Sequence, residues 1–315
     1  MHESSVQTDQ QLVRTAAVGP SSRTCFFMGY SSITGNAGAL RSLCGVEENV
    51  FALLLSMLPT VRDRSTDITI ENKLVMFLMK MKLGISFSAL SVIFGTHKST
   101  ASRAFFSVLY TLAEATGDWI YKPPIDDIKI AQPACFRKNY PECTLIIDCT
   151  EMKTEAPSEV RQQHMLFSQY KGCYTLKVLV GSIPNGMVVF ASKPYGGRCS
   201  DTHITLESGF LNIVEEGDMI LADKGFPGIR THLASKGVVM IMPPFSVGGN
   251  VPFTPQEMEQ TYTIASVRIY VERAIQRIKL YNILKHVPIK LIPSMKEIFH
   301  MCCVLANLQP PIISS

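Results

Sequence analysis

The stretch TLIID, residues 144–148, is an apolar run that ends in the carboxylate of Asp148. A second run, MILAD at residues 219–223, ends in Asp223 in the same way. Both runs are too apolar to be surface strands, so they predict two buried strands of an α/β sheet. In open α/β sheets, sites form at the edge where the strands end. The two runs therefore predict an acidic site at one edge of a buried sheet.

A third acidic residue, Glu272, lies in the basic stretch RIYVERAIQRIK at residues 268–279. The apolar positions of a long helix, from about residue 264 to 284, repeat at helical spacing. Glu272 falls beside that stripe, where it can reach the edge of the sheet. Each acid alone has an ordinary explanation, as a turn former, a helix cap or half of a surface salt bridge. Together they predict ligands for two divalent cations, Mg²⁺ or Mn²⁺, over a phosphodiester.

The order of the predicted elements defines the fold class. Strands are predicted at residues 144–148, 174–183, 187–193, 219–223 and 238–242, with helices at 203–214, 228–235 and 264–284. Three strands followed by helix, strand, helix, strand and helix is the order of a ribonuclease H-like α/β fold. That fold holds its metal-binding acids where Asp148, Asp223 and Glu272 fall.

Four segments are expected along the chain. Residues 1–44 are rich in Ser, Thr, Gly and Gln without periodicity, so we expect a flexible tail. Residues 45–122 predict a helical domain, and the prolines of residues 123–143 predict a linker. Residues 144–311 form the predicted α/β domain.

The helical segment contains a candidate DNA-binding motif. A short helix at 84–95, ended by its last glycine, and a second helix at 101–115 predict a helix-turn-helix. The polar residues at the start of the second helix are of the kind that a recognition helix presents to DNA. These residues are Lys98, Ser99, Thr100 and Arg103. The alternative is a plain helical hairpin whose apolar face is simply core, and such hairpins are far more common.

The charge of the chain is more informative in its distribution than in its sum. The formal net charge is only +4, but basic residues gather around Glu272 in a pattern that fits a phosphate backbone. The predicted DNA contacts in this part of the chain are Lys224, Arg268, Arg273, Arg277 and Lys279. Lys224 and Arg273 each adjoin an acid, so they either neutralise phosphate charge or offset the carboxylates.

The remaining composition points to an intracellular protein. Nine cysteines without a CxxC pair favour reduced, buried thiols over a zinc site or a disulfide framework. The N-terminal residues do not resemble a signal peptide, and the longest apolar stretches are short or interrupted by lysines, so no membrane span is expected.

With these features, the chain resembles Harbinger-like DDE transposases and their host-domesticated relatives, in which a helix-turn-helix precedes the DDE superfamily endonuclease domain. The resemblance covers roughly residues 45–311. It rests on the motifs IDCTE at 147–151, YK at 170–171, TLK at 175–177, PNG at 184–186, SD at 200–201, ADKGF at 222–226, PPF at 243–245, RIYVERAI at 268–275 and ANLQPP at 306–311.

The resemblance implies roles for individual residues. Asp148, Asp223 and Glu272 would be the DDE triad, and Asp201 a further acid of the metal site. Asp201 also suits the N-cap of the helix that follows it, and both roles can hold together. Some relatives carry a zinc-dependent DNA-binding module at the N-terminus. Residues 1–44 lack its Cys/His spacing, so a second DNA reader is expected to be absent or supplied by a separate partner protein.

The expected function is divalent-metal-dependent cleavage and strand transfer on double-stranded DNA. The expected location is the nucleus, with the cytoplasm as the alternative, and a homo-oligomer is compatible with this function. One alternative is a domesticated, non-catalytic DNA-binding or adaptor protein that retains the fold. A weaker one is a ribonuclease acting on RNA–DNA hybrids, which a helix-turn-helix that reads duplex DNA disfavours.

Overall fold

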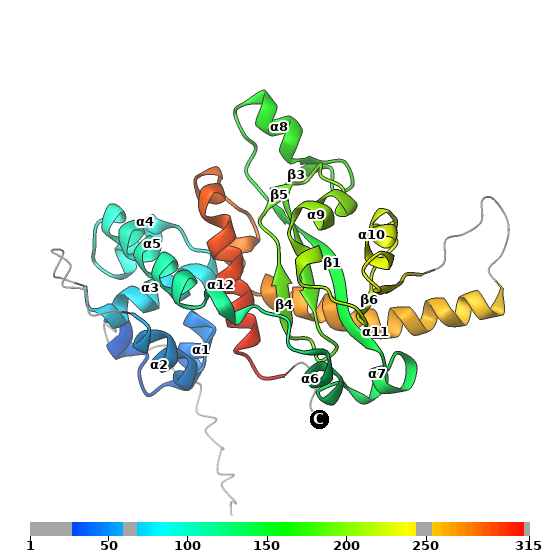
Figure 1. The fold of residues 1–315 in the computed structure, drawn as a ribbon. Coiled ribbons are helices and arrows are strands. Elements are labelled where there is room, and N and C mark those ends of the chain that lie inside the picture. Colours follow the sequence, from blue (N-terminus) through cyan, green and yellow to red (C-terminus); the bar gives the residue numbers. More distant parts are fainter. Residues whose placement is uncertain (1–26, 59–67, 244–253, 312–315) are drawn as a thin grey trace, which may run out of the picture.

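A computed structural model describes residues 27–58, 68–243 and 254–311 (Figure 1). The N-terminal part is helical. Its elements are η1 (Gly29–Ser32), α1 (Ala37–Cys44), α2 (Glu48–Ser56), α3 (Ile70–Leu83), α4 (Phe87–Ile93), α5 (Lys98–Ala115) and η2 (Gly117–Trp119). Within the described ranges, every helix is too short or too polar to span a lipid bilayer.

Local capping explains where the helices of this part begin and end. The Ser86 side chain accepts a hydrogen bond from the Ala89 backbone at the start of α4, and the His97 ring accepts one from the Ser99 backbone at the start of α5. Gly84, with a φ of 69°, ends α3 in the left-handed region. Helix α5 starts earlier than predicted, so Lys98, Ser99 and Thr100 form its first turn.

The expectation of a flexible tail over residues 1–44 is wrong for its second half. Residues 29–44 form η1 and α1, and the side chains of Leu40 and Cys44 are buried. The Tyr30 backbone donates to Asn72 Oδ1 of α3 at 2.7 Å. The apolar residues here are too few to show a helical period, and they become buried only against α3. Residues 1–26 lie outside the described residues.

The predicted linker, residues 123–143, contains two short helices rather than an extended connection. They are α6 (Ile125–Ile130) and α7 (Ala134–Asn139). Pro124 and Pro133 directly precede them, as expected for a residue that starts helices and interrupts them elsewhere. Ile128 and Phe136 are buried against the sheet domain, so this connection packs as part of that domain.

The C-terminal part is built on a mixed sheet. Its strands are β1 (Cys143–Lys153), β2 (Phe167–Ser168), β3 (Cys173–Ser182), β4 (Val188–Ala191), β5 (Tyr195–Gly196), β6 (Met219–Leu221) and β7 (Val239–Ile241). The order is β2-β3-β1-β6-β7, with β4 and β5 also paired to β3. Strand β1 is antiparallel to β3 and parallel to β6, and β6 is parallel to β7. This is the ribonuclease H-like fold that the sequence predicts.

Helices cover both faces of the sheet (Figure 1). One face packs against α11 (Pro255–Lys279) and α12 (Met295–Asn307) through side chains that include Ile146 and Val180. The other face, with Leu145 and Ile147, packs with the segment that carries α9 (Asp201–Glu207) and α10 (Arg230–Ala234). The remaining elements are α8 (Val160–Leu166), η3 (Phe210–Asn212), η4 (Pro227–Ile229), η5 (Asn282–Leu284) and η6 (Ile289–Ser294).

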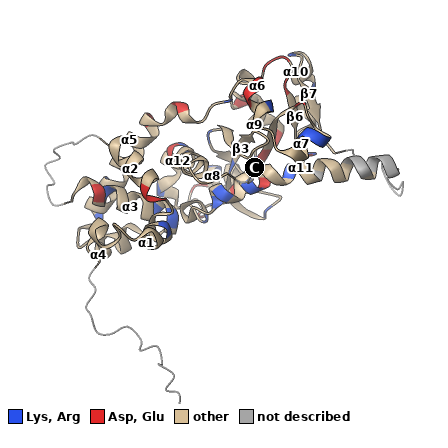
Figure 2. Cartoon of the chain, turned by 90° about the horizontal axis from the view of Figure 1, so that it is seen from below, with Lys and Arg blue, Asp and Glu red and all other residues tan. Residues whose placement is uncertain are grey.

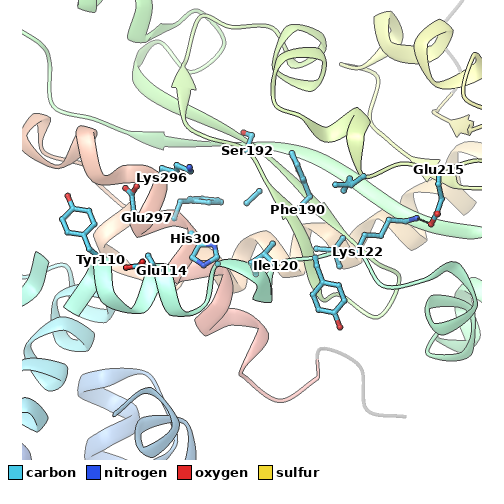
Figure 3. A pocket seen from close by; sticks show the side chains of 17 residues that line it. Tyr110, Glu114, Ile120, Lys122, Phe190, Ser192, Glu215, Lys296, Glu297 and His300 are labelled. Carbon is cyan, nitrogen blue, oxygen red and sulfur yellow. Dashed lines mark hydrogen bonds and ion pairs between the residues drawn. The ribbon is translucent and has the colours of Figure 1, made fainter. Parts of the chain in front are cut away.

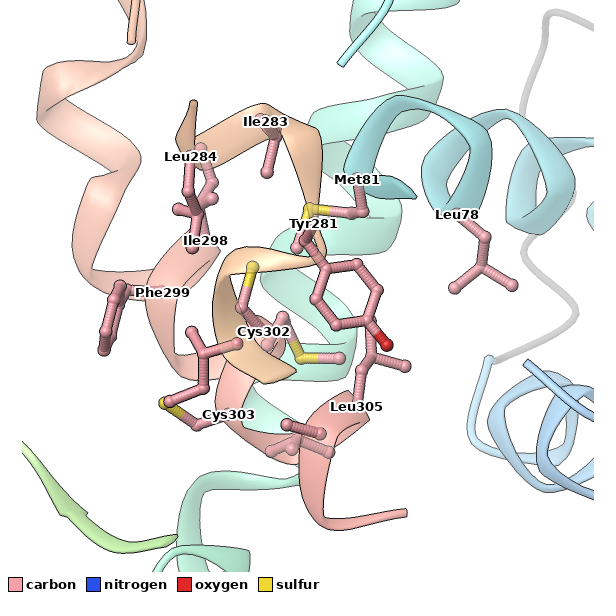
Figure 4. Packing of buried hydrophobic residues seen from close by; sticks show 14 of the residues in the cluster. Leu78, Met81, Tyr281, Ile283, Leu284, Ile298, Phe299, Cys302, Cys303 and Leu305 are labelled. Atoms are coloured by element: carbon pink, nitrogen blue, oxygen red, sulfur yellow. The ribbon is translucent and has the colours of Figure 1, made fainter. Parts of the chain in front are cut away.

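The helical part and the sheet domain share one core. Figure 4 shows Leu78 and Met81 of α3 beside Tyr281, Ile283 and Leu284, with Cys302 and Leu305 of α12 in the same cluster. Tyr281 is only 1% exposed. Because α12 packs against both parts, the α4–α5 hairpin is held in a fixed position relative to the sheet.

Lys80 is a buried charge within the helical part. It is 5% exposed, its Nζ donates to the Ile85 carbonyl at 2.8 Å, and it lies 4.8 Å from the centre of the Phe87 ring. This contact ties the end of α3 to the start of α4. Burial lowers the pKa of Lys80 from 10.5 to about 8.

Lys80→Met is expected to flatten the pH dependence of stability above pH 8. The folded pKa lies below the unfolded one, so the unfolded state binds more protons between about 8 and 10.5. Wild-type stability should therefore rise across that window, by on the order of 1–3 kcal/mol. Urea titrations at several pH values would measure the rise. Lys82→Met, on the same helix, is the control that should keep the wild-type slope, and an unchanged slope in Lys80→Met would contradict the assignment.

Candidate active site

Asp148 lies at the point of β1 where the neighbouring parallel strand ends. Ile146 pairs with Leu221, the last residue of β6. Asp148 follows Ile146 by two residues, and Asp223 follows Leu221 by two residues. The two aspartates therefore lie at the same level of the sheet, just beyond the carboxyl end of β6. Each carboxylate accepts a hydrogen bond from the next backbone amide, at 2.8 Å for Asp148 and 2.7 Å for Asp223.

Asp201 approaches the same edge from the start of α9. Ser200, not Asp201, caps this helix, because the Ser200 hydroxyl accepts from the His203 backbone at 3.2 Å. The expectation of Asp201 as N-cap is therefore wrong, and its carboxylate instead accepts from Lys177 Nζ at 3.1 Å. A Cβ on Gly225 would lie 2.7 Å from Asp201 Oδ2. The glycine thus lets the segment after Asp223 pass directly beside Asp201.

Electrostatic interactions show that the three aspartates influence one another. The pKa of Asp148 is raised from 3.8 to about 6, mainly by burial and to a smaller extent by the charges of Asp223 and Asp201. Arg268 and the Cys149 backbone act in the opposite direction. A divalent cation near these carboxylates would relieve the repulsion among them.

Arg268 supplies the positive charge at this edge. Its Nη1 lies 3.2 Å from Asp223 Oδ1, and its side chain is 13% exposed. Lys279 lies three turns further along α11 on the same face and interacts electrostatically with Asp148. The sequence placed both among DNA contacts and did not predict this role. Their spacing of eleven residues, which returns to one helix face, was the available signal.

Glu272 does not lie with the three aspartates. It is exposed and lies one turn beyond Arg268 on α11. Among the described residues, Asp223 and Asp201 raise the pKa of Asp148, and Glu272 is not one of the groups that affect it. Across residues 27–58, 68–243 and 254–311, no three His, Cys, Asp or Glu side chains stand close enough to hold a metal ion. Asp148, Asp201 and Asp223 therefore influence one another electrostatically without forming a closed metal site, and Arg268 of α11 contacts Asp223.

The other predicted DNA contacts separate into groups. Arg273 lies over the Tyr270 ring at 5.6 Å, and Arg277 donates to the Pro310 carbonyl at 2.7 Å. Lys224 is exposed beside Asp223. On α5, Lys98, Ser99 and Arg103 are exposed, whereas Thr100 is half-buried. Figure 2 shows that residues of both charge signs occur in both parts of the chain.

A separate cavity of about 930 Å³ lies away from these acids (Figure 3). Tyr110 of α5, Phe190 of β4 and His300 of α12 contribute to its wall. None of Asp148, Asp201 and Asp223 lines it. Its carboxylates, Glu114, Glu215 and Glu297, come from other elements, so this cavity and the aspartate cluster are distinct features.

The fold defines a ribonuclease H-like domain behind a helical domain. Residues 147–307, slightly more than half of the 315 residues, match the family described as DDE superfamily endonuclease. Residues 66–118 match the helix-turn-helix of DDE superfamily endonuclease. The chain therefore belongs to the DDE superfamily endonucleases and is a transposase-like protein. The α4–α5 hairpin is the helix-turn-helix of this family. No curated protein matches the chain significantly.

Proposed function

We propose that this protein cleaves DNA phosphodiester bonds and transfers DNA strands with the help of divalent cations, through Asp148, Asp223 and Glu272. The observation that supports this most directly is the meeting of Asp148 and Asp223 at the end of β6, with Asp201 beside them. DNA, the substrate, would be handled in the nucleus.

The residues at this edge fit hard divalent cations. All the candidate ligands are carboxylates, which suit Mg²⁺ and Mn²⁺. The Asp223 side chain is 47% exposed and that of Asp201 is 26% exposed, so both are accessible from solvent. When bound, two such ions would activate a water or a DNA 3′-hydroxyl and stabilise the leaving oxygen.

Each residue of the acidic site has a distinct role in this proposal. Asp148, the most buried of the acids, would bridge the cations. Asp223 and Asp201 would hold them from either side, with Lys177 keeping the Asp201 carboxylate in position. Arg268 offsets the charge of the aspartates, and Glu272, one turn away on α11, would be a further carboxylate ligand for the cations. The Arg268 guanidinium would also suit a DNA phosphate.

One observation favours the alternative, a DNA-binding protein that does not cleave. Arg268, not Glu272, is the α11 residue that contacts the aspartates. An arginine that stays in place would keep cations out. Incubation of supercoiled plasmid with the full chain and Mg²⁺ or Mn²⁺ decides between the two. Nicked or linear product that EDTA prevents supports cleavage, and binding without product supports the alternative.

Lys98→Ala/Arg103→Ala is expected to weaken binding to duplex DNA. Both side chains are exposed at the start of α5, so each can neutralise one phosphate without contributing to the core. The slope of log K against log salt should fall by about one unit for each lost contact. Fluorescence anisotropy over a salt series would measure it.

The matched control is Lys129→Ala/Lys138→Ala, which removes two lysines from α6 and α7. It should leave the slope unchanged. If the α5 variant also kept the wild-type affinity and slope, the hairpin would not contact DNA, and α11 would be the main DNA-binding element.

A further inference from the structure

A cleft lies where the helix-turn-helix part meets the sheet domain. Its volume is about 820 Å³, and Gly84, Lys153, Lys279, Lys285 and His286 are among its lining residues. They come from the end of α3, the end of β1 and the chain from α11 to beyond η5. We call it the junction cleft.

The two walls of the junction cleft are fixed to each other. Gly84 has a φ of 69°, and a Cβ on it would lie 2.8 Å from the Asn282 carbonyl oxygen. Only glycine allows this approach of α3 to η5. The shared core of Tyr281 with Met81 lies behind it (Figure 4). The cleft is therefore a permanent feature between the two parts rather than a gap between mobile domains.

The rim of the junction cleft is cationic. Lys153, Lys279, Lys285 and His286 are exposed. Glu151 is the one carboxylate among its described lining residues, and that carboxylate is already engaged. Its Oε1 lies 3.6 Å from Lys177 Nζ, and its Oε2 accepts from the Thr175 hydroxyl at 2.7 Å. The lysines of the rim thus have no carboxylate of their own within the cleft.

A second lysine, Lys171, lies near enough to Lys279 to repel its charge, although burial has the larger effect on the pKa of Lys279. Partial burial lowers the pKa of Lys279 and the neighbouring Lys171 lowers it further, while Asp148 and Glu151 oppose the change. An anion in the cleft would relieve this repulsion. The interaction with Asp148 also shows that Lys279 connects the cleft to the aspartate cluster.

The position of the cleft indicates which anion it would hold. Lys153 lies five residues beyond Asp148 on β1, a distance of about 16 Å along the strand. Along B-DNA this corresponds to about five base pairs. Ammonium groups spread along a groove of this size suit a row of phosphates better than one small anion.

We propose that the junction cleft binds the phosphate backbone of the substrate duplex about five base pairs from the bond held at Asp148, between the helix-turn-helix and the acids. This inference rests on the proposed DNA-cleaving function. It assigns part of the DNA affinity to Lys153 and Lys285, neither of which belongs to the aspartate cluster or to α5.

The test is DNA binding by full-length Lys153→Gln/Lys285→Gln in EDTA, measured by fluorescence anisotropy across a salt series. The duplex must be long enough to span both parts. The slope of log K against log salt should fall by about 1.8 units, because each lost phosphate contact contributes about 0.9. Lys129→Gln/Lys138→Gln is the control with the same loss of charge. Both variants should melt nearly as the wild type does, because Lys138, Lys153 and Lys285 are exposed and Lys129 makes only a solvent-accessible ion pair with Glu142.

The outcomes separate this inference from the proposed function. A reduced slope for the cleft variant alone supports it, even if the wild type binds DNA without cleaving it. An unchanged slope, or an equal reduction in the control, overturns the cleft assignment while leaving cleavage intact. Inorganic pyrophosphate is a second probe. If it raises the wild-type melting temperature but not that of the cleft variant, and the DNA slope is unchanged, the cleft holds free phosphates rather than DNA and the inference is overturned.

Discussion

Asp148→Asn is expected to reduce Mg²⁺-dependent cleavage of supercoiled DNA by at least about 10³-fold, equivalent to about 4 kcal/mol of transition-state stabilisation. The amide keeps the size of the side chain and its hydrogen bond from the Cys149 backbone, but it removes the charge that would bridge the cations. Initial rates of plasmid nicking at saturating metal would measure the loss.

Asp126→Asn, an exposed aspartate of α6, is the matched control and should retain wild-type activity. Glu272→Gln and Asp201→Asn then identify the third ligand. An equal loss in Glu272→Gln supports the triad that the family resemblance implies. A loss confined to Asp201→Asn would place the third ligand on α9. Full activity in Asp148→Asn would remove the aspartate cluster from the reaction.

The sequence predicted the sheet and the level of its two aspartates because both depend on local pattern. A strand buried on both faces must be apolar along its length, so the apolar stretches TLIID and MILAD predict buried strands. Parallel pairing of β1 with β6 then places Asp148 and Asp223 side by side, as the register of Ile146 with Leu221 shows.

The sequence could not predict which α11 side chain faces the aspartates. Arg268 and Glu272 are four residues apart, so they lie only about 40° from each other around the helix. Helical periodicity places both residues on the same boundary between the buried face and the exposed face of α11. The choice depends on charge, because in the absence of cations three carboxylates attract a guanidinium and repel another carboxylate. That balance requires the position of Asp201, which is brought in by α9 and by the close approach of Gly225.

The domain boundaries depended on long-range packing and were less predictable. Leu40 and Cys44 look like isolated apolar residues in a polar segment until α3 covers them. In the sequence, helix α12 is only another apolar stretch. In the structure it packs against α5, β4 and α11 and joins them into one core. That packing and the approach of α3 to η5 show that the helix-turn-helix and the sheet domain form one packed unit, on which the junction cleft depends.

Mg²⁺ is expected to raise the melting temperature of the wild-type protein at about pH 7.5, and Asp148→Asn/Asp223→Asn is expected to abolish the rise. A cation that binds only the folded state stabilises it by about 2.7 kcal/mol when its free concentration is a hundredfold above Kd. For a chain of 315 residues this corresponds to roughly 4 °C. The gain should shrink as the pH falls through about 6, because protonation of Asp148 competes with the cation. Thermal melts at a series of Mg²⁺ concentrations and pH values would measure it.

The single variant Asp148→Asn separates metal binding from structural damage, because its two effects have opposite signs. In the wild type, the pKa of Asp148 is about 6 in the folded state and 3.8 in the unfolded state. The folded state therefore binds more protons between these two pH values. Metal-free stability of the wild type therefore falls as the pH rises from about 3.8 through 6. The neutral amide should remove this fall and raise metal-free stability near neutral pH by on the order of 1–3 kcal/mol. A variant that melts higher without Mg²⁺ and responds less to it has lost a cation ligand rather than its fold. An equal rise with Mg²⁺ in the double variant would show that the cation acts elsewhere on the protein.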